Sequence, residues 1–412
     1  MEASAHMLAG VRPLGAERCR LDQVFGRVLA RDVVSPIFLP PRDNASMDGF
    51  AVHADDVRGA TVEHPVRLRV VGTIAAGGEV TRAIARGEAA RIMTGAYVPG
   101  GADSVVRVED TRMDAEVLCV LDGRDAERNI RLRGEDVRAD QIVMREGTHI
   151  AAAQVGVLAA VGCVAPTVHR RPRVAILATG DELVPVERFA EVMSGSRIVS
   201  SNSYALEAAV LAAGGEPVSL GIAPDDPASL ADRLREADGC DLVVTSGGVS
   251  VGDFDYTREV VTALGGTLSL WRVRMRPGAP LGFGTLFGVP WIGLPGNPVS
   301  ALVTFELFGR PLIRSLGGHA RPHRRTIGVT LAEPLRLGAP LTHFLRVVLE
   351  GGDGALPVAR LTGAQSSGML TSMSAADALM IVPAEPLDVA AGTALRALPL
   401  DGDLGGSDRF LA

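Results

Sequence analysis

Lysine is absent from this sequence, and all 41 basic residues among the 412 are arginine. The absence excludes a Walker-type phosphate-binding lysine and a pyridoxal Schiff-base lysine. Any anion must therefore be bound by arginine, backbone N–H groups, hydroxyls or a metal ion. Cysteine is scarce and forms no CxxC pair, which argues against a zinc ribbon or a disulfide framework and fits a reducing cytosol. The four cysteines are Cys19, Cys119, Cys163 and Cys240.

Long apolar runs are also missing. The N-terminus lacks the basic start and the long apolar core of a signal peptide. The most apolar run, Ile150–Pro166, is too short for a membrane span and is expected to contain a buried helix. The net charge of −7 gives no reason to expect nucleic acid as a partner. We therefore expect a cytoplasmic protein that contacts neither a membrane nor nucleic acid.

The first part of the chain is expected to be rich in short strands. Helices are predicted at Leu21–Leu29 and at Ala151–Val161. Between them the pattern predicts short strands joined by glycine turns, and the clearest are Val66–Thr73, Ala89–Met93 and Ser104–Glu109. This region is therefore expected to fold as a β-rich domain.

After Pro172 the pattern alternates between strands and helices, which predicts a mainly parallel sheet covered on both faces. The expected strands are Val174–Ala178, Pro217–Leu220, Leu242–Thr245, Leu281–Phe283 and Trp291–Leu294. The expected helices are Ser203–Ala213, capped by Asn202 or Ser203, then Pro227–Ala237, Tyr256–Leu264 and Val299–Leu316. Beyond a basic, proline-containing break at 319–325, only strands are expected, which predicts a small β-barrel-like domain.

These patterns predict an α/β multidomain protein. They predict a β-rich first part, a central doubly wound α/β domain and a C-terminal β-barrel-like domain. The expected boundaries are 170–320 for the α/β domain, 321–400 for the barrel and 401–412 for a tail.

A glycine loop follows the apolar strand Leu242–Thr245. Ligands of open parallel sheets bind beyond the carboxyl ends of the strands. Glycines there let backbone N–H groups approach an anion, and two serines add hydroxyl donors. The alternative is a tight structural turn, because glycine pairs after strands are common. The residues of interest are Ser246, Gly247, Gly248 and Ser250.

Carboxylates are expected at the same sheet edge. Asp181 and Glu182 follow strand Val174–Ala178, and carboxylates at a phosphate site make sense as Mg²⁺ ligands or ribose partners. The alternative is a solvated turn. Asp225 and Asp226 precede Pro227, so they could equally be a helix cap.

Two further features favour anion binding. Asn297 as N-cap and Pro298 at the first helical position define a helix N-terminus, which attracts negative charge, although simple capping is the alternative. Arg272, Arg274 and Arg276 alternate along an expected strand and would point to one face, suiting oxyanions. The alternative for this arginine stripe is a solvated edge strand.

Six segments together resemble the molybdopterin molybdenumtransferase family, represented by the bacterial protein MoeA and by the E domain of gephyrin. The resemblance runs from about Leu21 to Leu398. Any one segment is a moderate signal, whereas all six in order are specific. The segments are Asn44–Ala51, Met93–Ala96 with Pro99–Asp103, Arg133–Asp136, Thr179–Leu183, Thr245–Thr257 and Gly293–Ser300.

The resemblance implies an elongated N-terminal region at 1–40 with 141–169, an inserted β-rich domain at 41–140 and an α/β domain of the molybdopterin-binding type. It further implies a transferase reaction. Adenylylated molybdopterin and molybdate would give the molybdenum cofactor and AMP, with Mg²⁺ as cofactor, in the final step of cofactor synthesis. It also implies a homodimer with a shared active site, and a molybdopterin adenylyltransferase as a possible partner. A non-catalytic cofactor carrier or scaffold is the alternative, and a related nucleotide hydrolase is a third reading. Tungstate is as compatible as molybdate, because the two oxyanions are close in size and charge.

The resemblance also assigns residues. The implied catalytic residues are Asp48, Thr94, Asp136, Glu182, Asp225 and Asp255, of which Glu182, Asp225 and Asp255 are the implied metal ligands. The implied binding residues are Ser246, Gly247, Gly248, Ser250, Arg272, Arg276, Pro298, Ser300, Arg346 and Ser367. Arg272 and Arg276 stand where many relatives have lysine, and Ala279 stands where relatives often carry a cation.

Overall fold

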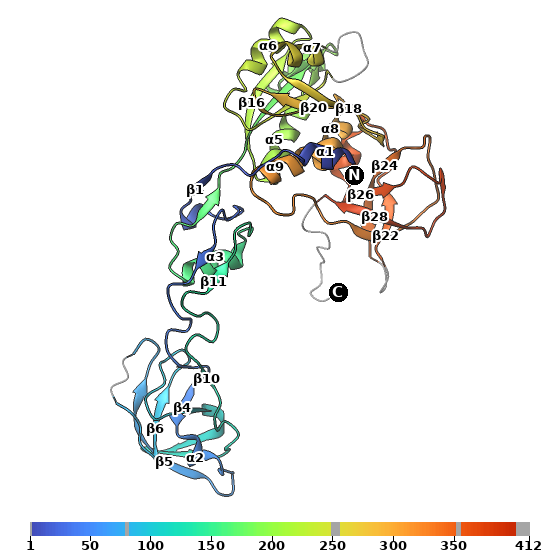
Figure 1. Ribbon diagram of the computed structural model, residues 1–412. Coiled ribbons are helices and arrows are strands. Elements are labelled where there is room, and N and C mark those ends of the chain that lie inside the picture. Colours follow the sequence, from blue (N-terminus) through green and yellow to red (C-terminus); the bar gives the residue numbers. More distant parts are fainter. Residues whose placement is uncertain (1, 79–81, 249–255, 352–355, 401–412) are drawn as a thin grey trace. The chain divides into compact units, whose positions relative to one another are not determined.

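A computed structural model describes residues 2–78, 82–248, 256–351 and 356–400 (Figure 1). The chain divides into two compact units. Unit 1 comprises Met1–Arg31, Gly147–Ala152 and Ala165–Ala412, and unit 2 comprises Asp32–Glu146 and Ala153–Val164. None of the described helices is both long and apolar enough to cross a membrane.

Unit 2 is built on a six-stranded sheet with the order β7-β4-β6-β5-β9-β8. Its core is apolar, with Phe50, Leu68 and Leu118 buried on one side, and this confirms the expected β-rich region. The sheet strands are β4 (Gly49–Val52), β5 (Val66–Ile74), β6 (Glu88–Ile92), β7 (Ser104–Arg107), β8 (Thr111–Asp114) and β9 (Val117–Val120). Shorter elements are β2 (Val33–Val34), β3 (Asn44–Ala45), α2 (Ala54–Val57), η2 (Val108–Asp110), β10 (Ile130–Arg131), β11 (Ile142–Met144) and α3 (Ala152–Ala160).

The predicted helix at Leu21–Leu29 is wrong. Only one 3₁₀ turn, η1 (Leu21–Gln23), forms there. Gly26 adopts a φ of 77°, which ends helical geometry, and Leu29 pairs instead with Val168 as an isolated bridge. A short helix that the pattern did not predict, α1 (Glu2–Leu8), precedes this turn and buries Met7. Strand β1 (Ala16–Arg18) pairs with β12 (Thr167–His169).

The central sheet of unit 1 has the order β16-β13-β17-β21-β20-β18. The first four strands are parallel and the last two are antiparallel, so the sheet is mainly parallel as predicted. The strands are β13 (Arg173–Thr179), β16 (Glu216–Ala223), β17 (Leu242–Ser246), β18 (Thr267–Arg272), β20 (Pro280–Leu286) and β21 (Val289–Leu294).

Helices cover both faces of this sheet, because neighbouring strand residues point to opposite sides. On β13, Val174 and Ile176 pack with helices α5, α8 and α9, whereas Ala175 and Leu177 pack with α6 and α7. The helices are α5 (Ser201–Ala213), α6 (Pro227–Arg235), α7 (Thr257–Ala263), α8 (Pro298–Thr304) and α9 (Arg310–Leu316). Between β13 and α5 lie β14 (Leu183–Val184), η3 (Val186–Arg188), α4 (Phe189–Met193) and β15 (Ile198–Val199).

The long helix expected at Val299–Leu316 is interrupted. A π-helical turn, η4 (Phe305–Gly309), separates α8 from α9. Pro311 in the first turn of α9 has no N–H, so it cannot donate to the α-helical ladder at this point. The apolar pattern continues across the interruption, which explains why periodicity alone did not reveal it.

The C-terminal sheet has the order β19-β24-β25-β22-β28-β26, and a further pairing between β24 and β26 closes it on itself. This confirms the barrel-like domain. Strand β19 (Met275–Arg276) belongs to the preceding segment of the chain and pairs in parallel with β24. The expectation of strands alone is wrong, because α10 (Leu370–Ser374) is helical. The other strands are β22 (Ile327–Leu331), β23 (Leu335–Arg336), β24 (Thr342–Glu350), β25 (Val358–Leu361), β26 (Ala378–Val382), β27 (Asp388–Val389) and β28 (Ala394–Pro399).

Candidate functional site

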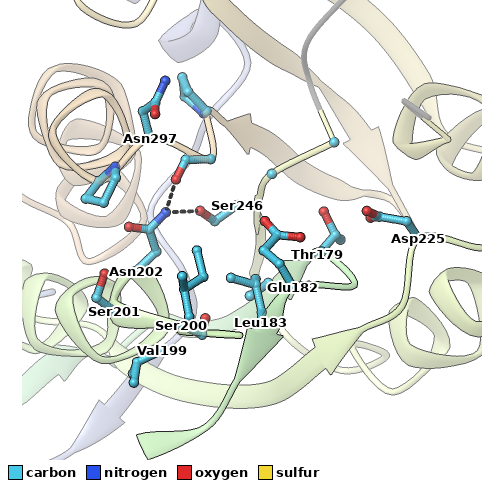
Figure 2. Close-up of a pocket in the computed structure, with 18 of the residues that line it drawn as sticks. Thr179, Glu182, Leu183, Val199, Ser200, Ser201, Asn202, Asp225, Ser246 and Asn297 are labelled. Atoms are coloured by element: carbon cyan, nitrogen blue, oxygen red, sulfur yellow. Dashed lines mark hydrogen bonds between the residues drawn. The ribbon is translucent and has the colours of Figure 1, made fainter. Parts of the chain in front are cut away.

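A cavity of about 530 Å³ opens where strands β13, β17 and β21 end. We call it the acidic pocket, because its lining includes the carboxylates of Glu182 and Asp225. Figure 2 shows these side chains together with Thr179, Asn202 and Ser246. The position agrees with the rule that open α/β sheets bind ligands at this edge. The sequence-predicted residues that meet here are Glu182, Asp225, Ser246, Gly247, Gly248 and Pro298.

The backbone conformation and the close packing of the loop require glycine at both described positions, whether or not a ligand binds. Gly247 and Gly248 have φ values of 96° and 64°, in the left-handed region. A Cβ at Gly247 would lie 2.6 Å from the carbonyl oxygen of Thr179, and a Cβ at Gly248 would overlap the hydroxyl of Thr257. The structural-turn interpretation therefore explains the glycines, and the turn also keeps the backbone against the pocket. Ser250 and Asp255 lie outside the described residues.

The carboxylates of the acidic pocket repel one another. Burial raises the pKa of Asp225, and the negative charges of Asp181 and Glu182 raise it further. Asp226 does not contribute to the pocket, because its Oδ1 accepts the Ser229 N–H at 2.9 Å and caps α6. The capping alternative thus holds for Asp226, whereas Asp225 lines the pocket.

One buried hydroxyl in this pocket is without a hydrogen-bond partner among the described residues. Thr179 is 7% exposed, and its Oγ1 makes no hydrogen bond within the described part of the chain. Among those same residues, no three His, Cys, Asp or Glu side chains are grouped to hold a metal ion. Mg²⁺ commonly takes one or two protein carboxylates and completes its shell with water and substrate phosphate. Glu182, Asp225 and the orphaned Thr179 hydroxyl fit such a partly built site.

Asn202 is a pocket residue that sequence reasoning missed, since it was interpreted only as a helix cap. Helix α5 begins at Ser201, so Asn202 lies inside its first turn. Its Nδ2 donates to Ser246 Oγ at 2.8 Å and to the carbonyl oxygen of Gly296 at 2.8 Å (Figure 2). The amide therefore joins the end of β17 to the loop that follows β21. No periodicity or spacing in the sequence signals this contact.

The N-terminus of α8 lies beside the acidic pocket. Asn297 occupies the N-cap position and Pro298 the first helical position, as predicted, although the Asn297 side chain makes no capping hydrogen bond. The N–H of Val299 donates to the carbonyl oxygen of Ser367 at 3.1 Å. A loop of the barrel thus satisfies one of the helix donors that an anion could otherwise use.

A second cavity, of about 740 Å³, lies between the α/β segment and the barrel of unit 1. We call it the basic pocket, because arginine and histidine side chains and no carboxylates are found among its described lining residues. Pro280 and Asn297 line both pockets, so the two cavities are neighbours. The polar lining side chains include Arg276, Ser300, Arg336, His343, Arg346 and Ser367.

Arg346 is fully buried beside the basic pocket and has no acidic partner among the described residues. Its Nε donates to Ser372 Oγ at 3.0 Å, and Nη1 donates to the Gln365 carbonyl oxygen at 3.2 Å. Its Nη2 donates to the carbonyl oxygens of Ala364 and Ser366 at 3.3 and 3.0 Å. Burial lowers the pKa of this guanidinium. The side chain therefore holds the loop that carries Ser367.

The predicted arginine stripe is wrong. Arg272 ends β18 in the central sheet, whereas Arg276 belongs to β19 in the barrel sheet. The chain turns between them, since the N–H of Val273 donates to the carbonyl oxygen of Ala279 at 2.9 Å. Arg276 lines the basic pocket and Arg272 lines neither pocket. Ala279 also lines the basic pocket, which gains Arg336 from the barrel, a residue that sequence reasoning did not select.

In unit 2, two of the sequence-predicted residues are in contact. Asp48 Oδ1 accepts the Thr94 N–H at 2.7 Å and the Thr94 hydroxyl at 2.6 Å. These bonds, and more weakly the charge of Arg91, lower the pKa of Asp48. Asp48 is therefore an ionised acceptor near neutral pH. Asp136 is exposed, and its N–H donates to the carbonyl oxygen of Leu39 at 3.1 Å.

Three parts of this chain match models of known protein families. Residues 1–162 match the MoeA N-terminal region (domain I and II), 175–315 a probable molybdopterin binding domain, and 328–400 the MoeA C-terminal region (domain IV). The α/β domain with its edge pocket therefore defines a protein of the molybdopterin-binding class. This chain belongs to the MoeA family of molybdopterin molybdenumtransferases and is an enzyme. The resemblance seen in the six sequence segments is confirmed.

The similarity extends over nearly the whole chain. A molybdopterin molybdenumtransferase of Nostoc sp. is 37% identical over 380 residues, covering 91% of this chain and 86% of that one. Molybdopterin molybdenumtransferase 2 of Mycobacterium tuberculosis is 37% identical over 402 residues, covering 96% and 97%. The crystal structure of the molybdopterin biosynthesis MoeA protein from Pyrococcus horikoshii has a TM-score of 0.82 at 28% identity, covering 97% of this chain and 98% of that one.

Proposed function

We propose that this enzyme inserts molybdenum from molybdate into adenylylated molybdopterin and releases AMP, as the final step of molybdenum cofactor synthesis. One observation carries the proposal: two neighbouring pockets of opposite chemistry share Pro280 and Asn297 within one compact unit. The acidic pocket suits a metal-bridged phosphate, and the basic pocket suits a free oxyanion. The relatives are named as transferases, so the alternative of a carrier or scaffold is not favoured.

In the acidic pocket, Glu182 and Asp225 would hold Mg²⁺, together with Asp255. The bound ion supplies the positive charge that lets phosphate oxygens approach these carboxylates. Ser246 and the backbone N–H groups of Gly247 and Gly248 would bind phosphate oxygens, with Ser250 as a further hydroxyl donor. Pro298, the first residue of α8, lines the pocket. These roles rest on the lining of the pocket and on the family resemblance.

In the basic pocket, Arg276 would bind the oxyanion with its forked guanidinium. Ser300 and Ser367 add hydroxyl donors, and Arg346 keeps the loop of Ser367 in place. Arg336 would provide the cation that Ala279 lacks. Molybdate and tungstate both suit such a pocket.

The remaining expectations concern assembly. We propose a cytoplasmic homodimer in which Asp48, Thr94 and Asp136 contribute to a shared active site. Arg272 would contact substrate only in such an assembly, because it lines neither pocket of the single chain. A molybdopterin adenylyltransferase would deliver the adenylylated substrate. Sedimentation of the purified protein tests the dimer independently of catalysis.

Turnover provides the direct test of function. Purified protein is incubated with adenylylated molybdopterin, Mg²⁺ and molybdate, and AMP and metal-loaded cofactor are measured. We expect both products, dependent on Mg²⁺. Absence of both would refute the proposal, and tight cofactor binding without turnover would favour a carrier. A parallel reaction with tungstate measures the preference between the oxyanions.

A further inference from the structure

The amide of Asn202 has a fixed orientation. One atom of this amide lies 2.8 Å from the carbonyl oxygen of Gly296, and a carbonyl oxygen can only accept a hydrogen bond. That atom must therefore be the nitrogen, Nδ2, which resolves the ambiguity between the two ends of the amide. The same nitrogen lies 2.8 Å from Ser246 Oγ.

This orientation determines how Ser246 can bond. An amide nitrogen donates and has no lone pair to accept, so Ser246 Oγ is the acceptor in this contact. The hydroxyl proton of Ser246 is then left for another acceptor. Ser246 is 3% exposed and lines the acidic pocket, and Asn202 is the hydrogen-bond partner of its side chain within the described part of the protein. Because Ser246 lines the pocket, an anion bound there is an acceptor that this proton can reach.

We infer that Asn202 is a positioning residue that makes Ser246 a hydrogen-bond donor to an anionic oxygen in the acidic pocket. The ligand class is a phosphate group, as in a nucleoside monophosphate. The inference rests on the proposed function insofar as AMP is a product that this pocket releases. Beyond the proposed function, Asn202 gains a positioning role and Ser246 is assigned as the hydrogen-bond donor.

A purely structural role for Asn202 would have a different effect on ligand binding. A structural link between the end of β17 and the loop that follows β21 would support every ligand of the pocket equally. A donor fixed by Asn202 favours the charged phosphate, because hydrogen bonds to ionised acceptors are about twice as strong as neutral ones. The phosphate should therefore gain from Asn202, whereas a neutral nucleoside should not.

Calorimetric titration with AMP, adenosine and inorganic phosphate, in the presence of Mg²⁺, tests this. The variant Asn202→Asp keeps the shape of the side chain, but its carboxylate accepts the Ser246 proton instead of donating. We expect AMP affinity to fall about tenfold or more, and adenosine affinity to change less than about twofold. Ala208→Asp, which places the same charge on the exposed side of α5, is the control and should keep wild-type affinity for AMP.

A double-mutant cycle separates the hydrogen bond from the added charge. Ser246→Ala should weaken AMP binding about tenfold in the wild-type background but less than about twofold in the Asn202→Asp background, because the donor is already lost there. Equal weakening of AMP and adenosine, or an unchanged cost of Ser246→Ala in both backgrounds, would overturn the inference. Wild-type protein that binds neither AMP nor phosphate would also overturn it, while the turnover assay judges the proposed function separately.

Discussion

The two pockets of unit 1 differ in charge although they share two lining residues. The acidic pocket presents Glu182 and Asp225, and no arginine is found among its described lining residues. The basic pocket presents Arg276 and Arg336, and no carboxylate is found in the corresponding lining. The loops of the parallel sheet supply the first set, whereas β19 and the barrel supply the second.

This separation indicates two kinds of anion binding. A phosphate can enter a carboxylate-lined pocket only with a cation, because the like charges otherwise repel. A free oxyanion needs no metal where guanidiniums are already present. The absence of lysine strengthens the contrast, since arginine stays charged throughout the accessible pH range and cannot be deprotonated to relieve crowding. Three predictions test the contrast.

Removing a carboxylate from the acidic pocket should have the largest effect. Glu182→Gln should lower Mg²⁺-dependent turnover by about 10²-fold or more, because one ligand charge of the metal is lost. Thermal stability should not fall, since Glu182 is exposed. Steady-state assays over a range of Mg²⁺ concentrations measure this. Glu187→Gln, the same change on an exposed residue outside the pocket, is the control. If Glu182→Gln turned over substrate at the wild-type rate, the acidic pocket would not depend on this carboxylate to hold a metal.

Removing a guanidinium from the basic pocket should have a smaller and more selective effect. Arg276→Ala should raise the KM for molybdate about tenfold and leave AMP binding unchanged, because the two ligands occupy different pockets. Arg274→Ala is the matched control, since Arg274 is exposed two residues away and lines neither pocket. If AMP binding fell as much as molybdate binding, the pockets would act as one site.

The smallest effect concerns folding stability. Burial and neighbouring carboxylates raise the pKa of Asp225 in the folded state, so folding favours its protonated form. Its unfavourable contribution is absent at acid pH and develops as the pH rises through the folded-state pKa. Asp225→Asn should therefore stabilise the metal-free protein near pH 7 by up to about 1 kcal/mol, and not below pH about 4. Thermal unfolding in a chelator at both pH values checks this, and stabilisation that is the same at both would contradict it.

Much of the fold could be predicted because its signals are local. The continuous apolar strand Val174–Ala178 and the apolar strand Leu242–Thr245 indicate strands buried on both faces, and they lie side by side in the sheet. The carboxylates and glycines after them meet at one edge, since parallel strands end there together. The helices predicted at Ser203–Ala213, Pro227–Ala237 and Tyr256–Leu264 also form with nearly the expected bounds.

The predictions that were wrong or incomplete concern features that depend on contacts between residues far apart in the sequence. Alternation predicted one strand through Arg272 and Arg276, but a turn between them sends Arg276 to another sheet. The position of Asn202 near a helix start suggested a cap, whereas its partners, Ser246 and Gly296, lie 44 and 94 residues away in sequence. The burial of Arg346 also depends on carbonyl groups that only the folded barrel brings together.

Strand β19 has a consequence for dissecting this protein. Its two residues, Met275 and Arg276, come from the α/β segment but pair with Thr342 and His343 of the barrel sheet. A fragment that begins after the helix α9 would leave β24 with unpaired N–H and C=O groups on that side, and such open strand edges promote aggregation. Expressing the barrel alone therefore requires a substitute for β19. Cutting the chain anywhere between β19 and β24 separates these two strands and leaves the edges of both unpaired.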